Sequence, residues 1–115
     1  MVVGVGRMEL ELEGVRSLKE KRAILSSILD RVRNRFMVSA AEVGHQDAHE
    51  RALLGFACVS NDGPHANEVM DRVLGFASSL GLARVADRRT ELVHLSDERP
   101  RDEVTLDWAS FEEPS

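Results

Sequence analysis

Apolar and polar residues alternate along the first segment of the chain. From Met8 to Leu12 every second residue is apolar, and the positions between them are acidic. A period of two is typical of a β-strand that buries one face. We therefore expect a strand from Val2 to Glu13, ended by Gly14.

The next segment has the pattern of an amphipathic helix. Ser17 and Glu20 have the spacing of a capping box, in which each side chain bonds a free backbone N–H at a helix start. Apolar residues follow at intervals of three, four and seven and fall within about 100° of one another on a helical wheel. They are Leu18, Leu25, Ile28, Leu29, Val32 and Phe36. The helix is predicted to end near Phe36.

The remaining chain predicts three more strands and a second helix. The turn residues Asn61, Asp62, Gly63 and Pro64 precede apolar positions at helical spacing, and Gly81 can end that helix in a left-handed conformation. Strands are predicted at 37–43, at 52–59 and at 84–95. The middle one is apolar at both odd and even positions, which is typical of a strand covered on both faces.

This order predicts the α+β class and a ferredoxin-like split βαβ fold. In that fold, βαββαβ segments form a four-stranded antiparallel sheet with both helices on one face. Residues 1–95 form the single domain, and residues 96–115 form an acidic C-terminal tail. The other sheet face is then bare unless another subunit, a ligand or RNA covers it.

Four stretches also carry a family resemblance. They are Val2-Val3-Gly4-Val5, Arg16-Ser17-Leu18-Lys19-Glu20-Lys21-Arg22, Val38-Ser39-Ala40-Ala41-Glu42-Val43 and Val59-Ser60-Asn61-Asp62. In these residues the chain resembles the YlxP-type bacterial domain family of unknown function, over roughly residues 1–95. The resemblance implies a ferredoxin-like fold. Genes of this family often lie beside those for translation initiation factor two and ribosome-binding factor A, which implies a ribosome-related role by association. It implies no catalytic residue.

Charge is concentrated in the first predicted helix. The chain has a net charge of −5, yet residues 16–35 hold seven basic and two acidic residues. A local basic element can contact phosphate even in an acidic protein, but nothing here reads bases, so no DNA specificity is expected. The alternative is a solvated helix face whose long side chains cover the edge of the core. The residues expected to contact ribosomal RNA or a ribosome subunit are Lys19, Lys21, Arg22, Arg31, Arg33 and Arg35.

The bare sheet face gives an alternative function. It would be the interface of a homodimer or the site of a small ligand, and the residues expected there are Val3, Val5 and Phe56. The strand Leu54–Val59 partly matches an RNA-recognition motif. However, Cys58 stands where a second aromatic ring is needed, so base stacking on this strand is not expected.

One polar segment carries residues that can bind metal. His45, Asp47 and His49 alternate, and an extended backbone would place them on one side. No second cluster with matching spacing accompanies them, so local hydrogen bonding in a turn is the main interpretation. We predict no metal and no cofactor.

The sequence contains no motif that indicates catalysis. The single cysteine, Cys58, lies among apolar residues, where a thiol is usually inert, and nucleotide-binding glycine motifs are lacking. We expect a non-enzymatic binding protein. One cysteine and no long apolar run predict a cytoplasmic protein without membrane segments.

The acidic tail interleaves bulky apolar residues with carboxylates. Val104, Leu106, Trp108 and Phe111 lie among five acidic residues. Such a segment can dock on a basic surface, in the same chain or on a neighbouring subunit. The alternative is a disordered solubilising tail.

Overall fold

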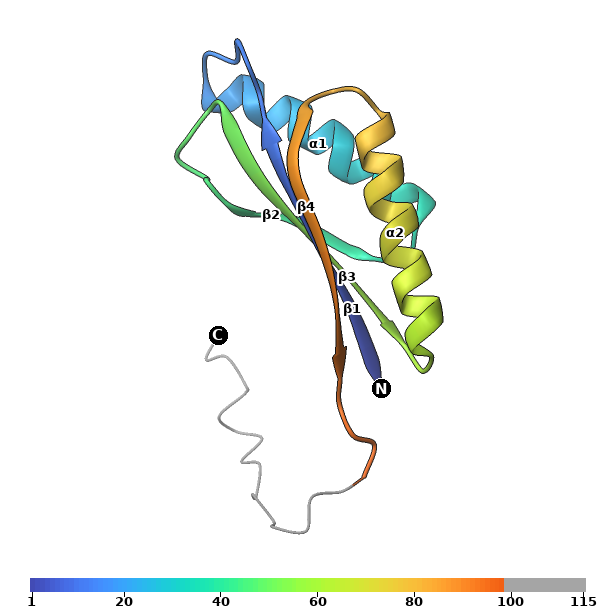
Figure 1. Ribbon diagram of the computed structural model, residues 1–115. Coiled ribbons are helices and arrows are strands. Elements are labelled where there is room, and N and C mark those ends of the chain that lie inside the picture. The colour runs from blue at the N-terminus through green and yellow to red at the C-terminus, as the bar shows by residue number, and fades with distance from the viewer. Residues whose placement is uncertain (99–115) are drawn as a thin grey trace, which may run out of the picture.

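Residues 1–98 form four strands and two helices in the predicted order (Figure 1). A computed structural model describes residues 1–98. The elements are β1 Val2–Glu11, α1 Leu18–Arg35, β2 Ser39–Gly44, β3 Arg51–Ser60, α2 Gly63–Ser79 and β4 Arg84–His94. The predicted docking of the tail through Trp108 lies outside the described residues.

The four strands form one antiparallel sheet in the order β2-β3-β1-β4. The central strand β1 pairs with both β3 and β4, so Val3 lies between Val59 on one side and Val93 on the other. This arrangement confirms the α+β, ferredoxin-like fold that the order of the elements predicted.

The alternation in β1 places its even-numbered residues toward the helices. Met8 and Leu10 are at most 2% exposed, and the pattern continues through Gly4 and Gly6 to Val2. From β3, the same side of the sheet receives four buried residues. They are Ala52, Leu54, Phe56 and Cys58. Together with the inner sides of both helices, these residues form the hydrophobic core.

Glycines in β1 allow α2 to lie close to the sheet. A Cβ atom on Gly4 would lie 3.1 Å from the carbonyl oxygen of Ala66 and 3.1 Å from Cγ of Met70. A Cβ on Gly6 would lie 3.3 Å from the sulfur of Met70. These distances are shorter than ordinary van der Waals contacts. The two glycines therefore set how closely the helix packs on the strand.

Side chains cap both helices at their first turns. The Ser17 hydroxyl accepts a hydrogen bond from the Glu20 backbone N–H at 3.1 Å, as the capping pattern predicted. The Glu20 carboxylate accepts from the Arg16 N–H, one residue before the cap. Asp62 caps α2 by accepting from the His65 N–H at 3.2 Å.

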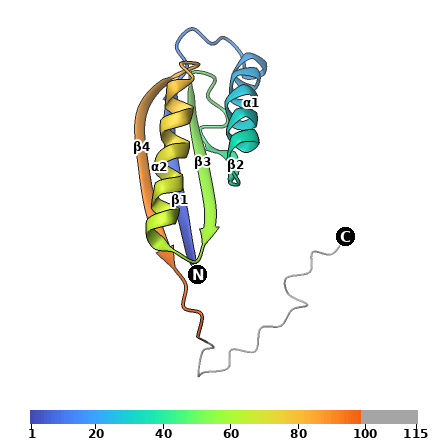
Figure 2. The same cartoon turned by 90° about the vertical axis from the view of Figure 1, so that its right-hand side faces the viewer.

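Both helices lie on one face of the sheet (Figure 2). The helix α2 packs against β1, β3 and β4, whereas α1 packs against β2 and α2. The opposite face of the sheet carries no helix within residues 1–98. No helix in this part of the chain is long and apolar enough to cross a membrane.

Candidate nucleic-acid interface

Five of the six basic residues predicted to contact RNA are exposed on α1. They are Lys19, Arg22, Arg31, Arg33 and Arg35. At 100° per residue they form two flanks of the helix, one with Lys19, Arg22 and Arg33 and the other with Arg31 and Arg35. With a rise of 1.5 Å per residue, the first flank extends along about 21 Å of the helix.

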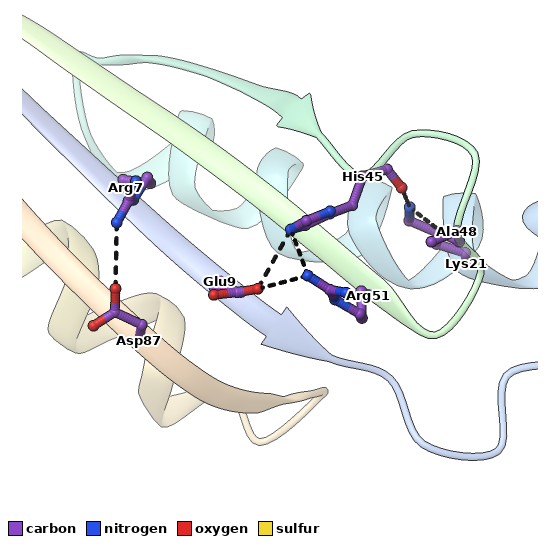
Figure 3. A network of polar contacts seen from close by, with 7 residues as sticks. All are labelled: Arg7, Glu9, Lys21, His45, Ala48, Arg51 and Asp87. Carbon is purple, nitrogen blue, oxygen red and sulfur yellow. Dashed lines mark hydrogen bonds and ion pairs between the residues drawn. The ribbon is translucent and has the colours of Figure 1, made fainter.

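Lys21 corrects the predicted set, because its side chain is only 1% exposed. Its ammonium donates hydrogen bonds to the carbonyl oxygens of His45 (2.7 Å) and Ala48 (2.6 Å), as Figure 3 shows. It also lies 2.8 Å from Oε2 of Glu42, as an ion pair without the alignment of a hydrogen bond. A buried ammonium with these partners is not available to phosphate.

The buried position of Lys21 follows from helical spacing. Lys21 comes three residues after Leu18, four before Leu25 and seven before Ile28, so it lies within the apolar stripe. Polar partners compensate for the cost of removing its charge from water. Lys21 therefore holds the chain between β2 and β3 against α1, which is a structural role.

The two flanks differ in how their side chains are held. On one flank, Arg33 donates a hydrogen bond to the Ala40 carbonyl at the start of β2 and lies 3.4 Å from Asp30. On the other flank, the Arg35 guanidinium lies 4.7 Å from the centre of the Phe76 ring on α2. Both arginines stay exposed while one side of each is fixed by the fold.

The three candidate metal ligands do not converge. His45 has its Nε2 3.3 Å from Oε1 of Glu9 and 3.2 Å from Nη2 of Arg51 (Figure 3). His49 instead places Nδ1 2.7 Å from the carbonyl oxygen of Val15. Within residues 1–98 no three His, Cys, Asp or Glu side chains are grouped so that they could hold a metal ion. The His45 and His49 side chains contact Glu9 and Val15, which are distant in the sequence, whereas a local backbone hydrogen bond runs from the Ala48 N–H to the His45 carbonyl oxygen at 3.0 Å.

The open face of the sheet carries a row of valines. Val59, Val3 and Val93 lie side by side on three strands, and Val59 is 73% and Val93 48% exposed. Val5 lies on the same face, as expected. Phe56 is a correction, because it points into the core and is only 3% exposed.

Next to the valines, the open face becomes charged. Arg7 and Asp87 form an ion pair at 3.3 Å across β1 and β4 (Figure 3). Arg89 is paired with Arg7 in the sheet register, and Glu91 with Val5. An open depression of about 660 Å³ lies here and is lined by Val5, Gly6, Arg7, Arg89, Thr90 and Glu91. The valine row is therefore bounded by charge on one side.

A groove between the helices was not predicted from the sequence. It lies where the end of α1 meets α2 and contains Phe36 and Phe76, which the helical pattern assigned only to the core. The consecutive residues Arg35, Phe36 and Met37 are the only local signal of this groove. Periodicity along one helix does not report how two helices meet, so the groove becomes visible only in the structure.

Comparisons with known proteins agree with the sequence resemblance. Residues 3–90 match the family described as "Protein of unknown function (DUF503)". "Uncharacterized protein YlxP" of Bacillus subtilis (strain 168) is 39% identical over 90 residues, which cover 78% of this chain and 98% of that protein. The solved structure of "De novo designed protein Foldit4" is similar with a TM-score of 0.47 and 14% identity, over 83% of this chain and 98% of that one. The chain belongs to the DUF503 family, and its similarity to YlxP confirms the predicted YlxP-type relationship.

Proposed function

We propose that this protein is a cytoplasmic, non-enzymatic RNA-binding protein that contacts ribosomal RNA through the exposed basic residues of α1. One observation supports this proposal most. Of these five residues, Arg33 alone forms an ion pair within the described part of the chain, and its partner is Asp30. Lys19, Arg22 and Arg31 project from α1 with solvent-exposed side chains. Such charges are suited to a phosphate backbone.

The proposed contact follows the RNA backbone and not its sequence. Arginine and lysine side chains neutralise phosphates and release counterions, so affinity falls as salt rises. The two flanks of α1 would contact neighbouring parts of a folded RNA or two strands. The acidic remainder of the chain opposes indiscriminate binding to polyanions. The ribosome as the source of this RNA is suggested by the family resemblance.

A binding role is also proposed in preference to catalysis. The single cysteine, Cys58, is 7% exposed and lies against α2, with its sulfur 3.9 Å from the Ala66 carbonyl oxygen. A thiol in this position is not presented to a substrate in solution.

Sedimentation with ribosomal subunits tests the proposal. The variant Arg22→Glu/Arg31→Glu reverses one charge on each flank, at positions whose side chains form no hydrogen bond or ion pair within residues 1–98. The control Arg88→Glu/Arg89→Glu makes the same change in net charge on β4. We expect the wild type and the control to sediment with one subunit at low salt and the α1 variant to stay in solution. No sedimentation of the wild type at low salt, or equal sedimentation of both variants, would contradict the proposal.

A homodimer through the open sheet face is the second candidate, and the exposed valine row favours it. Burying Val3, Val59 and Val93 against a second copy would remove apolar surface from water. Val59→Lys should then convert a dimer to a monomer in sedimentation velocity. A wild type that is monomeric at high concentration would rule this candidate out.

A further inference from the structure

The groove between the helices has apolar walls and basic edges. It is lined by Arg35 and Phe36 at the end of α1 and by Arg72, Gly75, Phe76 and Ser79 of α2, and its volume is about 690 Å³. Within residues 1–98, Phe36 and Phe76 are the only aromatic pair in contact. The groove therefore joins two of the three phenylalanine rings of residues 1–98 to the Arg31 and Arg35 flank of α1.

Inside the groove the two aromatic rings and the Arg35 guanidinium lie in contact. The Phe36 and Phe76 rings meet edge to face, with centroids 5.7 Å apart and planes inclined by 67°. The Arg35 guanidinium lies over the Phe76 ring at 4.7 Å and is 5.8 Å from the centre of Phe36. The inner side of the guanidinium is thus held by a cation–π contact. Its outer side is exposed to solvent.

Two residues beside these groups leave room and apolar surface for a ligand. A Cβ atom on Gly75 would meet nothing within 4 Å, so α2 has no side chain on this part of the groove. Met37, directly after Phe36, is 99% exposed. An exposed methionine is adaptable apolar surface that a flat ring can cover.

The charges at the groove favour an anionic partner. Arg31 and Arg35 are four residues apart and lie on the same side of α1. Across the groove, Arg72 is held 2.7 Å from Glu68 on the surface of α2. A ligand with both a flat ring and a phosphate suits a groove that combines aromatic rings with arginine side chains.

We propose that the groove binds one unpaired nucleobase of a single-stranded RNA segment. The base stacks on the outer side of the Arg35 guanidinium, supported from below by Phe76, and Arg31 contacts the adjoining phosphate. This inference rests on the proposed function and refines it: α1 binds backbone along its length, while its C-terminal end holds an unstacked base. The preference is for single-stranded over double-stranded RNA, because stacked neighbours cover both faces of a base inside a double helix, whereas an unpaired base can present a face to the protein.

The test compares a short oligoadenylate with a strand of the same phosphate backbone that lacks bases. The variant Arg35→Lys keeps the charge and removes the plane, and Arg89→Lys is its matched control on β4. A third variant, Gly75→Gln, fills the groove with a good helix former and leaves every arginine in place. Affinities are measured by fluorescence anisotropy, with urea denaturation to confirm that each variant is folded.

We expect the wild type to bind oligoadenylate about tenfold more tightly than the strand without bases, because one base stacks in the groove. Arg35→Lys and Gly75→Gln should remove this difference and leave the affinity for the strand without bases unchanged. Equal affinity of the wild type for both strands would overturn the stacked base, leave the phosphate contact standing and point to a protein partner for the groove. Binding to neither strand would overturn the proposed function as well.

Discussion

The inner and outer sides of the helix layer use similar residues for opposite purposes. Lys21 and Arg22 are neighbours on α1, yet the first is buried against carbonyl oxygens and a carboxylate while the second is exposed. Gly4 lies beneath α2, where there is no room for a Cβ atom. Gly75 lies on the outside of the same helix, where a Cβ atom would meet nothing within 4 Å. Residue type alone therefore does not separate buried structural positions from exposed ones. The side of the helix on which a residue lies does.

The largest effect is expected at Lys21. Lys21→Met removes the ammonium and leaves Glu42 and two carbonyl oxygens without their partner, so the free energy of unfolding should fall by about 3 kcal/mol. Urea denaturation measures this loss. The double variant Lys21→Met/Glu42→Gln should recover part of it, because the unpaired carboxylate is gone. A loss in Lys21→Met no larger than that of Arg22→Met would mean that the buried contacts do not stabilise the fold.

A smaller loss is expected where α2 crosses β1. Gly4→Val places side-chain atoms against the Ala66 carbonyl and Met70, so the helix must shift at a cost of about 2 kcal/mol. The matched change on the outer side is Gly75→Ala, which should raise stability by about 0.5–1 kcal/mol through helix propensity. Thermal unfolding of both variants measures these opposite changes in stability. Stabilisation by Gly4→Val would show that the helix does not rest on this glycine.

The smallest loss of stability is expected on the outer side at Arg33. Arg33→Ala removes a hydrogen bond to the Ala40 carbonyl and an exposed ion pair with Asp30, which together contribute about 1 kcal/mol. Arg31→Ala, without such contacts within residues 1–98, should leave stability unchanged within about 0.5 kcal/mol. Chemical denaturation of both variants measures the difference in their free energies of unfolding. Equal losses would mean that Arg33 is not fixed by β2.

The sequence predicted most of the fold because its signals are local. The alternation from Met8 to Leu12, the Ser17 cap and the turn before Pro64 each specify one element, and the order of elements then leaves a simple topology. The predicted and observed strands differ at their ends, since β1 stops at Glu11 and β2 starts at Ser39. Strand ends depend on pairing with neighbours, which a single segment does not encode.

The site was predicted less completely, for two physical reasons. Lys21 lies within the apolar stripe of α1 and is buried. The prediction counted the positive charges of the helix and did not consider on which side of the helix each one lies. Phe56 lies in a strand that is apolar at both odd and even positions, so the sequence pattern does not show which face of the sheet its side chain is on. That face is decided by the pairing of Phe56 with Gly6 on β1. The groove at Phe76 depends on how two helices meet. None of this is a property of one segment.

The salt dependence of RNA binding tests the central claim most directly. Affinity for single-stranded RNA would be measured over a series of salt concentrations for the wild type, for Arg22→Gln/Arg31→Gln and for the control Arg88→Gln/Arg89→Gln. If the flanks of α1 contact phosphate, the slope of log affinity against log salt should fall by about 1.4 in the α1 variant and stay unchanged in the control. Equal slopes for all three proteins, or no binding by the wild type at low salt, would contradict the account.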